Sequence, residues 1–382
     1  MFHPLRTFLF AALIGFALLA AACGDDDDSE DPTAEATSEA TQAEPTETAT
    51  ASPSATAAPT RVEIDPPADP PEDEGPYRVG VTVTQYLKTS VTTGVERTLE
   101  VVVWYPTDIV SAADDFLVGI RDAPGSVDAP FPLVIFSHGS GGNTLQSTFL
   151  TTHVASHGFV VASVSHPGNT TADCFPCGDQ AALQDSYRNR PDDVAFARDQ
   201  LINDSETKEG SVLLGLIDPE QVGIMGHSFG GYTTMAALVA GGFDAGASLA
   251  GAAEFGGTVL PLPGGSDSEI DVPVLLMGGT LDTTTPFTTA ANLYERLTAA
   301  PAKVLVELPR AGHLAFSNYC LQIVPGCGPN DVDPGVAHNL INLYVTAFFR
   351  YYLKGDDGYA QYLLPGSEQD AEAVIVEEDG VQ

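Results

Sequence analysis

The chain has 382 residues, 43% of them hydrophobic, and its 52 acidic and 15 basic side chains give a formal net charge of −37 at pH 7. Such an acidic surface repels nucleic acid and gains no attraction from anionic membranes, so the composition excludes a nucleic-acid-binding protein. The two ends of the chain differ in composition from its middle, so a single folded core does not account for all of it.

The first 23 residues have the form of an export signal. Arg6 precedes an apolar stretch, residues 8–22, that is short for a membrane span and ends in small residues before Cys23. This ending resembles a bacterial lipoprotein signal, in which the cysteine is lipidated and becomes the new N-terminus. Ala20 stands where such signals more often have leucine, so ordinary secretion is the alternative. We expect an exported protein, either secreted or attached to the cell envelope only through a lipid on Cys23.

Two acidic segments flank the expected folded domain. Residues 24–75 contain the run Asp25 to Asp28, repeated Thr, Ala, Glu and Pro, and almost no large apolar side chains. Such a segment cannot bury enough surface to offset its ordering entropy, which predicts a disordered linker. Residues 366–382 hold six acids and no base and are expected to be an acidic tail. The folded domain is therefore expected to span residues 76–365.

Four cysteines follow Cys23 in the sequence, and they are Cys174, Cys177, Cys320 and Cys327. In an exported protein they predict two disulfides, for which three pairings exist. Proximity in sequence favours Cys174 with Cys177 and Cys320 with Cys327. A redox-active pair is the alternative for Cys174 and Cys177, but their loop lacks the helix start that lowers a thiol pKa.

Strand-like and helix-like segments alternate from residue 77 onward. An antiparallel pair is expected first, and six short apolar runs follow, which suit strands buried on both faces. The expected strands are residues 78–87, 98–105, 131–137, 159–164, 222–225, 245–249, 272–277 and 303–308. The expected helices are residues 145–156, 191–202, 230–239, 287–297 and 336–352. Pro191, followed by two aspartates, predicts a helix start at that residue.

This order predicts an α/β fold with a mostly parallel sheet of about eight strands and helices on both faces. Ligand sites in such sheets lie beyond the carboxyl ends of the strands. The sequence Gly226-His-Ser-Phe-Gly230 follows the strand at 222–225, which is typical of a sharp strand–turn–helix with Ser228 exposed at its apex. Because the chain holds 37 glycines, such a motif can arise by chance, and its partners decide the prediction.

A serine nucleophile needs a base, and the base needs an acid that orients it. The candidate acid is Asp282, which follows the strand at 272–277. Asp282 could instead serve only the turn before Pro286, and Glu254 is the rival candidate for the acid. Only His313 and His338 lie beyond Asp282, and His313 is favoured because it sits in a loop directly after a strand. His338 lies in an expected helix. The candidate catalytic residues are therefore Ser228, Asp282 and His313.

Two backbone amides are expected to form an oxyanion hole. One is the amide of Phe229, and the other is that of Ser140 in the glycine-rich loop at residues 138–142, which follows the strand at 131–137. Glycines in this loop allow a close approach of the backbone. No metal or cofactor is required by this set of residues.

Several motifs, in order, resemble the α/β-hydrolase superfamily, and in particular its bacterial dienelactone-hydrolase-like and platelet-activating-factor acetylhydrolase-like serine esterases. These motifs are Trp104-Tyr-Pro106, Phe136-Ser-His-Gly139, Ala162-Ser-Val-Ser-His-Pro-Gly-Asn-Thr170, Arg190-Pro-Asp-Asp193 and Gly226-His-Ser-Phe-Gly-Gly231. The resemblance covers about residues 77–353. It implies a serine carboxylic-ester hydrolase that acts on short acyl esters through an acyl-enzyme, without cofactor or metal.

The sequence departs from parts of this resemblance. Dienelactone hydrolases proper use a cysteine nucleophile, and polyester hydrolases typically carry a tryptophan near the acyl site, whereas the only tryptophan here is Trp104, in an early strand. Phospholipid acetyl-ester or polyester hydrolysis is the alternative function, followed by a serine peptidase or a catalytically inactive binding module. Residues 169–190 look like an insertion at the rim of the site. We expect a monomer whose partner is a small-molecule or lipid ester.

Overall fold

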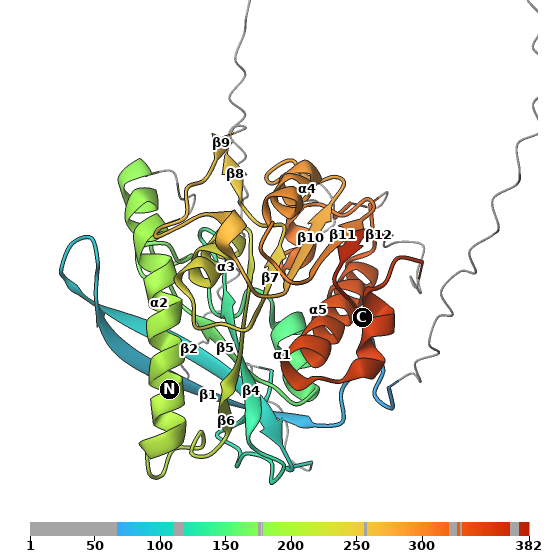
Figure 1. The fold of residues 1–382 in the computed structure, drawn as a ribbon. Coiled ribbons are helices and arrows are strands. Elements are labelled where there is room, and N and C mark those ends of the chain that lie inside the picture. The colour runs from blue at the N-terminus through green and yellow to red at the C-terminus, as the bar shows by residue number, and fades with distance from the viewer. Residues whose placement is uncertain are drawn as a thin grey trace, which may run out of the picture. The chain divides into compact units, whose positions relative to one another are not determined.

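The computed structural model describes residues 67–110, 118–174, 177, 179–255, 258–320, 327–328, 331–366 and 374–381 (Figure 1). The expected signal with Cys23 and residues 24–66 of the linker expected at 24–75 lie outside the described residues, whereas residues 67–75 are described and contact α1 and the residue after it. Among the described helices, none combines the length and the apolar character that crossing a bilayer requires.

One large sheet forms the centre of the described domain. Its strands are β1 (Arg78–Thr89), β2 (Glu96–Thr107), β3 (Ile120–Arg121), β4 (Phe131–Ser137), β5 (Val160–Val164), β6 (Ile217–His227), β7 (Ala245–Leu249), β10 (Val274–Gly279), β11 (Lys303–Leu308) and β12 (Val374–Asp379). Their order is β12-β11-β10-β7-β6-β4-β5-β2-β1-β3. The pairs from β5 through β11 are all parallel, which places β6 near the middle of the parallel part. β8 (Glu254–Phe255) and β9 (Thr258–Val259) form a small separate hairpin.

The large sheet has ten strands among the described residues, whereas the sequence predicts about eight. All eight expected strands are present, and β3 and β12 are the additions. β3 has two residues, too few to leave a periodic signal. β12 lies inside the segment expected as an acidic tail and pairs antiparallel with β11, so the sheet extends beyond residue 365. An edge strand pairs along one side only, so acidic residues there can stay in water.

Helices cover both faces of the sheet. α1 (Thr148–Ser156) and α5 (Pro334–Lys354) pack on one face, where Leu150 and Phe348 join Val102 and Trp104 of β2 in one apolar cluster. α2 (Gln180–Thr207), α3 (Phe229–Ala240) and α4 (Phe287–Arg296) cover the other face, where the alternate residues of β2, such as Val103, belong to a second cluster. The helices on the two sides of the sheet can be followed in Figure 1, and the alternation along β2 is the two-residue period of a strand buried on both sides. The predicted α/β-hydrolase architecture is confirmed.

The helix expected to start at Pro191 begins earlier, at Gln180. Its N-terminus is capped by the Asp179 side chain, which accepts a hydrogen bond from the Ala181 amide. Pro191 therefore lies inside α2, where it removes one amide donor that would otherwise bond to the Tyr187 carbonyl. That carbonyl accepts a bond from the Tyr232 hydroxyl of α3 at 3.4 Å instead. The Tyr232 hydroxyl thus replaces the amide donor that Pro191 lacks. This contact joins two helices, so the sequence alone does not predict it.

Buried neutral histidines predict a loss of stability in acid. Burial lowers the pKa of His157 and of His227 to about 3. Between about pH 6.5 and pH 3 the unfolded chain binds a proton at each position that the folded chain does not, so stability falls as pH falls. We expect each of these histidines to remove about 1.4 kcal/mol of unfolding free energy per pH unit in this window, measured by denaturant titration.

The variant His157→Gln tests this origin of the acid sensitivity. His157 donates from Nε2 to the Asp73 carbonyl at 2.9 Å, while Nδ1 has no partner among the described residues. Glutamine keeps an N–H donor but does not titrate. The unfolding free energy of His157→Gln should therefore fall less steeply with decreasing pH than that of the wild type, and the difference in slope should be about 1.4 kcal/mol per pH unit, the contribution of one histidine. Equal slopes for the two proteins would contradict the assignment.

Candidate active site

Ser228 lies at a sharp turn between the end of β6 and the start of α3. Its backbone has φ 58° and ψ −118°, a conformation that is strained for a residue with a side chain. The turn requires glycine on either side: a Cβ at Gly226 would lie 2.2 Å from the Gly230 carbonyl oxygen, and one at Gly230 would lie 1.8 Å from the Ser137 carbonyl oxygen. The sequence motif is thus the condition for a turn that presents the Ser228 hydroxyl beyond the strand.

The structure brings Ser228, His313 and Asp282 together in one hydrogen-bonded chain. The Ser228 Oγ lies 2.8 Å from His313 Nε2, and His313 Nδ1 lies 2.7 Å from Asp282 Oδ2. An ionised carboxylate only accepts hydrogen bonds, so Nδ1 carries the proton and Nε2 is free to accept from the serine hydroxyl. Asp282 follows β10 and His313 follows β11, at the carboxyl ends of parallel strands, as predicted.

Asp282 is held as a buried carboxylate. Burial alone would raise its pKa, but hydrogen bonds from His313 and Thr285 outweigh burial and lower the pKa below its ordinary value. The amides of Thr284 and Thr285 each donate to Oδ1 at 2.8 Å. The Thr285 hydroxyl lies 2.8 Å from Oδ2 and 3.1 Å from His313 Nδ1. At neutral pH, Asp282 is therefore a fixed negative charge beside the imidazole.

A second histidine ties the loops of the site together. His227 is buried, and burial keeps it neutral by lowering its pKa to about 3. Its Nε2 donates to the backbone oxygen of His313 at 2.9 Å, and its Nδ1 accepts from Gln146 Nε2 at 2.8 Å. Gln146 Oε1 in turn accepts from the Gly139 amide at 3.0 Å. This chain joins the loop after β4 to the loop that carries His313.

The two amides predicted for an oxyanion hole, those of Ser140 and Phe229, belong to segments next to Ser228. Ser140 belongs to the loop after β4, and Phe229 is the first residue of α3. A Cβ placed on Gly139 would lie 3.3 Å from the Ser228 Cβ, so this loop runs directly beside the nucleophile. Among the described residues, no group accepts a hydrogen bond from the Ser140 or the Phe229 amide. Both donors are therefore available to a ligand at Ser228.

Glu254, the rival acid, and His338, the other histidine after Asp282, do not belong to the hydrogen-bonded chain of Ser228. Glu254 accepts from Arg296 at 2.9 Å and does not contact His313. His338 stacks on Phe149 with ring centroids 3.6 Å apart, and its Nε2 lies 3.2 Å from the Ser317 carbonyl oxygen. Trp104 is fully buried in the core on the face covered by α1 and α5.

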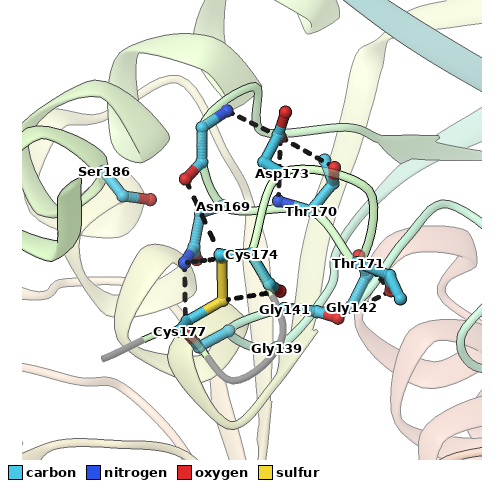
Figure 2. The surroundings of a disulfide bond; sticks show 12 residues. Gly139, Gly141, Gly142, Asn169, Thr170, Thr171, Asp173, Cys174, Cys177 and Ser186 are labelled. Atoms are coloured by element: carbon cyan, nitrogen blue, oxygen red, sulfur yellow. Dashed lines mark hydrogen bonds between the residues drawn. A yellow bond between two sulfur atoms is a disulfide. The ribbon is translucent and has the colours of Figure 1, made fainter. Parts of the chain in front are cut away.

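Two disulfides are present, between Cys174 and Cys177 and between Cys320 and Cys327, which is the pairing that sequence proximity favours. The first lies against the loop after β4, since a Cβ on Gly141 would lie 3.0 Å from Cys177 Sγ (Figure 2). In the part of the chain that the structure describes, no group of three or more His, Cys, Asp or Glu side chains could hold a metal ion.

Sequence reasoning missed several residues that hold the site together. Thr285 lies three residues after Asp282 in Asp282-Thr-Thr-Thr-Pro286, so its contact with the carboxylate is a local turn that the spacing could have suggested. Gln146 left no such signal, and Arg190 stood only as part of the motif Arg190-Pro-Asp-Asp193, because most of their partners lie in other segments of the chain.

A mostly parallel sheet, a strained serine at the end of its central strand, and partners in the chain order Ser, Asp, His are the features of serine hydrolases with the α/β-hydrolase fold, and this chain is of that class. Within the class, residues 105–379 match the PET hydrolase-like family. The chain belongs to this family, and the prediction of a carboxylic-ester hydrolase is confirmed.

Relatives with known names support this placement. The chain is 28% identical to cutinase 2 of Thermobifida cellulosilytica over 238 residues, which is 61% of this chain and 72% of the relative. A platelet-activating factor acetylhydrolase of Canis lupus familiaris is 25% identical over 163 residues, 32% of this chain and 36% of the relative. A ferulic acid esterase structure from Streptomyces cinnamoneus superposes with a TM-score of 0.60 at 22% identity, covers 81% of this chain and 98% of that chain, and shows the fold alone.

Proposed function

We propose that the protein hydrolyses carboxylic esters through an acyl-enzyme intermediate on Ser228. The observation that carries this proposal is the hydrogen-bonded chain from Ser228 through His313 to Asp282 at the strained turn. A serine hydroxyl becomes an effective nucleophile when an adjacent base accepts its proton, and the base acts best when a carboxylate fixes its tautomer. The distances of 2.8 and 2.7 Å meet both conditions.

In the first half of the reaction, Ser228 Oγ attacks the ester carbonyl carbon while His313 Nε2 takes its proton. The tetrahedral intermediate collapses, the bond to the alcohol oxygen breaks, and Nε2 returns the proton to that oxygen. In the second half, water attacks the acyl group with the same base, which releases the acid and restores Ser228. Asp282 remains ionised throughout and stabilises the imidazolium.

The amides of Ser140 and Phe229 would bind the carbonyl oxygen as it becomes negative. Backbone donors aimed at a developing oxyanion need no reorganisation during the reaction, and removal of one such donor in other enzymes typically lowers kcat by about 100-fold to 1,000-fold. Support for this role comes from the position of the loop beside Ser228 and from the two amides that lack other acceptors among the described residues.

We propose short-chain acyl esters of small alcohols as the substrate class. Family membership supports ester hydrolysis, and polyester cleavage is the second candidate because the family description names a PET hydrolase and several relatives are cutinases. Against the polyester, the only tryptophan of the chain is buried in the core on β2. The match to the acetylhydrolase covers 32% of this chain, which makes a phospholipid acetyl ester the weaker alternative.

We further propose that the enzyme works outside the cytoplasm. The apolar residues 8–22 before Cys23 support an export signal, with lipidation of Cys23 as the proposed anchor and secretion as its alternative. The two disulfides also suit an oxidising compartment. Residues 24–66 of the expected linker would then serve as an acidic spacer between the envelope and the domain, since the Pro71 and Asp73 carbonyls accept hydrogen bonds from His153 and His157 of the domain.

A fluorophosphonate probe tests the assignment directly. We expect one covalent adduct per chain, located at Ser228 by peptide mapping, and expect that prior incubation with p-nitrophenyl acetate slows its formation. A panel of p-nitrophenyl esters of increasing acyl length, a polyester film and a phospholipid acetyl ester then ranks the substrate classes by kcat/KM. A folded protein that neither reacts with the probe nor hydrolyses any of these esters would overturn the proposal in favour of an inactive binding module.

A further inference from the structure

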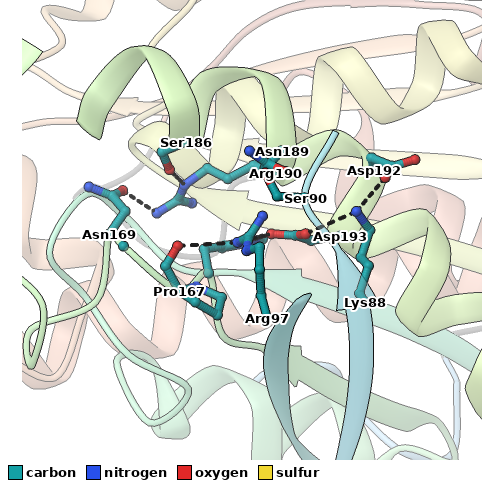
Figure 3. Close-up of polar contacts among 12 residues, drawn as sticks. Lys88, Ser90, Arg97, Pro167, Asn169, Ser186, Asn189, Arg190, Asp192 and Asp193 are labelled. Atoms are coloured by element: carbon teal, nitrogen blue, oxygen red, sulfur yellow. Dashed lines mark hydrogen bonds and ion pairs between the residues drawn. The ribbon is translucent and has the colours of Figure 1, made fainter. Parts of the chain in front are cut away.

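Arg190 is a fully buried arginine next to the candidate active site, and each of its N–H groups has an acceptor. A guanidinium carries five N–H donors, and burying it is costly unless they are satisfied. Nε donates to Ser186 Oγ at 3.0 Å and Nη2 donates to Asn169 Oδ1 at 2.7 Å (Figure 3). Nη1 also donates to the His138 carbonyl at 2.6 Å and to Ser137 Oγ at 3.4 Å, and Nη2 donates to the Gly139 carbonyl at 3.1 Å.

The charge of Arg190 is not neutralised by a direct ion pair with any described carboxylate. The nearby Asp193 pairs instead with Arg97 at 3.0 Å and with Lys88 at 3.6 Å (Figure 3). It also lies 3.1 Å from His166 Nδ1. Burial lowers the pKa of Arg190 to about 9, which still leaves the guanidinium charged at neutral pH. A buried positive charge is therefore present beside the Gly139–Ser140 peptide; its direct partners are hydroxyl, carbonyl and amide oxygens, and the nearby Asp193 carboxylate favours its charged form.

Arg190 contacts the peptide unit that carries the Ser140 amide and the ring of Phe229, whose own amide is the other donor assigned to the oxyanion hole. The Gly139 carbonyl and the Ser140 amide belong to one planar peptide unit, so holding the oxygen also fixes the direction of the N–H. The guanidinium carbon lies 4.6 Å from the centroid of the Phe229 ring, a cation–π contact with the residue that supplies the other amide. One side chain thus supports both halves of the site.

Asn169 adds a second connection to the same loop. Its Oδ1 accepts from Arg190, its Nδ2 donates to Ser140 Oγ at 3.0 Å, and its backbone carbonyl accepts from the Gly141 amide at 3.1 Å. Asn169 is fully buried and lies beside the disulfide of Cys174 (Figure 2). The loop that carries Ser140 is therefore held from Arg190 both directly and through Asn169.

A neighbouring set of residues has the composition of a catalytic triad but another role. His166 Nδ1 lies 3.1 Å from Asp193 Oδ2, and His166 Nε2 lies 2.9 Å from Ser137 Oγ. All three side chains are fully buried, so no ester reaches Ser137. Ser137 is instead one of the contacts of Arg190, and this chain helps to fix the guanidinium.

We propose that Arg190 is the positioning residue of the oxyanion hole, which aims the Ser140 amide, supports Phe229 and places a buried positive charge behind both donors. This inference rests on the proposed esterase function. The guanidinium itself does not touch the substrate in this arrangement. Its effect appears when negative charge develops on the carbonyl oxygen, so it should raise kcat far more than it lowers KM.

The variants Arg190→Gln and Arg190→Lys test the proposal, with Arg198→Lys as the matched control. Arg198 lies on the same helix and stacks on Phe243 at 4.9 Å, away from the site. We expect Arg190→Gln to lower kcat by about 100-fold to 1,000-fold, with KM changed by less than about threefold. Arg190→Lys should fall between it and the wild type, because it keeps the charge but not the paired donors. Arg198→Lys should match the wild type.

Two further measurements separate positioning from a general loss of structure. A trifluoromethyl ketone forms a tetrahedral oxyanion on the serine, so its Ki should rise in proportion to KM/kcat across the variants. The pH at half-maximal kcat should not change, because Ser228, His313 and Asp282 keep their contacts. Loss of kcat in folded variants with an unchanged ketone Ki, or kcat within about threefold of wild type, would overturn the role of Arg190.

If Arg190→Gln fails to fold, milder variants carry the same test. Asn169→Ala and Ser186→Ala each remove one acceptor of the guanidinium, and only Asn169→Ala also frees the Ser140 side chain. Asn169→Ala should therefore weaken ketone binding and kcat together and by more than Ser186→Ala, and the reverse order would contradict the proposal. A failure of the esterase function can be told apart from a failure of the Arg190 proposal, because in the first case the wild type itself would lack ester turnover and probe labelling at Ser228.

Discussion

Replacement of Ser228 by alanine should lower kcat for p-nitrophenyl butyrate by on the order of 10⁵-fold to 10⁶-fold, as removal of the nucleophile does in other triad hydrolases. Without Oγ no acyl-enzyme forms, and the base at 2.8 Å has no hydroxyl to deprotonate. The remaining rate would come from water attack assisted by the oxyanion hole. Alanine lacks only one atom, so binding of the ester should change little, and KM or product inhibition should stay close to the wild-type value.

The control for this variant is Ser268→Ala. Ser268 is exposed, and its hydroxyl bonds only to Ser266 among the described residues. Its kcat should equal that of the wild type. The variants should be compared in initial-rate assays after active-site titration of the wild type, with equal thermal unfolding profiles as the test of folding. A Ser228→Ala protein that retains more than about 1% of wild-type kcat would sink the assignment of the nucleophile, because such a rate requires another attacking group.

The three candidate catalytic residues could be predicted because, in an α/β sheet, the order of strands and loops along the chain determines which residues lie at the carboxyl edge of the sheet. A residue that directly follows a parallel strand lies at the carboxyl edge, so Ser228, Asp282 and His313 could be placed at one edge before any contact was known. The same logic identified the loop with Ser140. Each of these predictions depends on a local pattern of apolar run and loop, which a single sequence displays.

Other parts of the fold depend on contacts between distant segments and left no local pattern. α2 continues through Pro191 because Tyr232 of another helix bonds to the carbonyl that the proline leaves free. β12 forms where acidic residues suggested a tail, because β11 offers an unpaired edge. The role of Arg190 is of the same kind: its acceptors come from residues 137–139, 169 and 186, and the sequence places the arginine in a family motif without indicating what it contacts.

The second large effect concerns Asp282. Replacement by asparagine should lower kcat by about 10³-fold to 10⁴-fold at neutral pH, since the carboxylate sets the histidine tautomer. Oδ1 accepts from the amides of Thr284 and Thr285, both at 2.8 Å, so the carbonyl oxygen of asparagine must stay on that side. The amide nitrogen then takes the place of Oδ2, 2.7 Å from His313 Nδ1, and donates to it. The proton moves to Nε2, which can no longer accept from Ser228.

Glu254→Gln is the matched control because Glu254 is the rival acid. Glu254 follows β7 in the chain but pairs with Arg296 at 2.9 Å. The kcat of Glu254→Gln should therefore stay within about twofold of the wild-type value. The NMR resonances of the histidine N–H protons report the tautomer of His313 directly. The wild type should show the proton on Nδ1 of His313, and Asp282→Asn should show it on Nε2. A large loss of kcat in Glu254→Gln, with Asp282→Asn nearly unaffected, would transfer the role of the acid to Glu254. The amides around Oδ1 argue for the opposite result, because they leave the asparagine only one orientation, and that orientation disables the base.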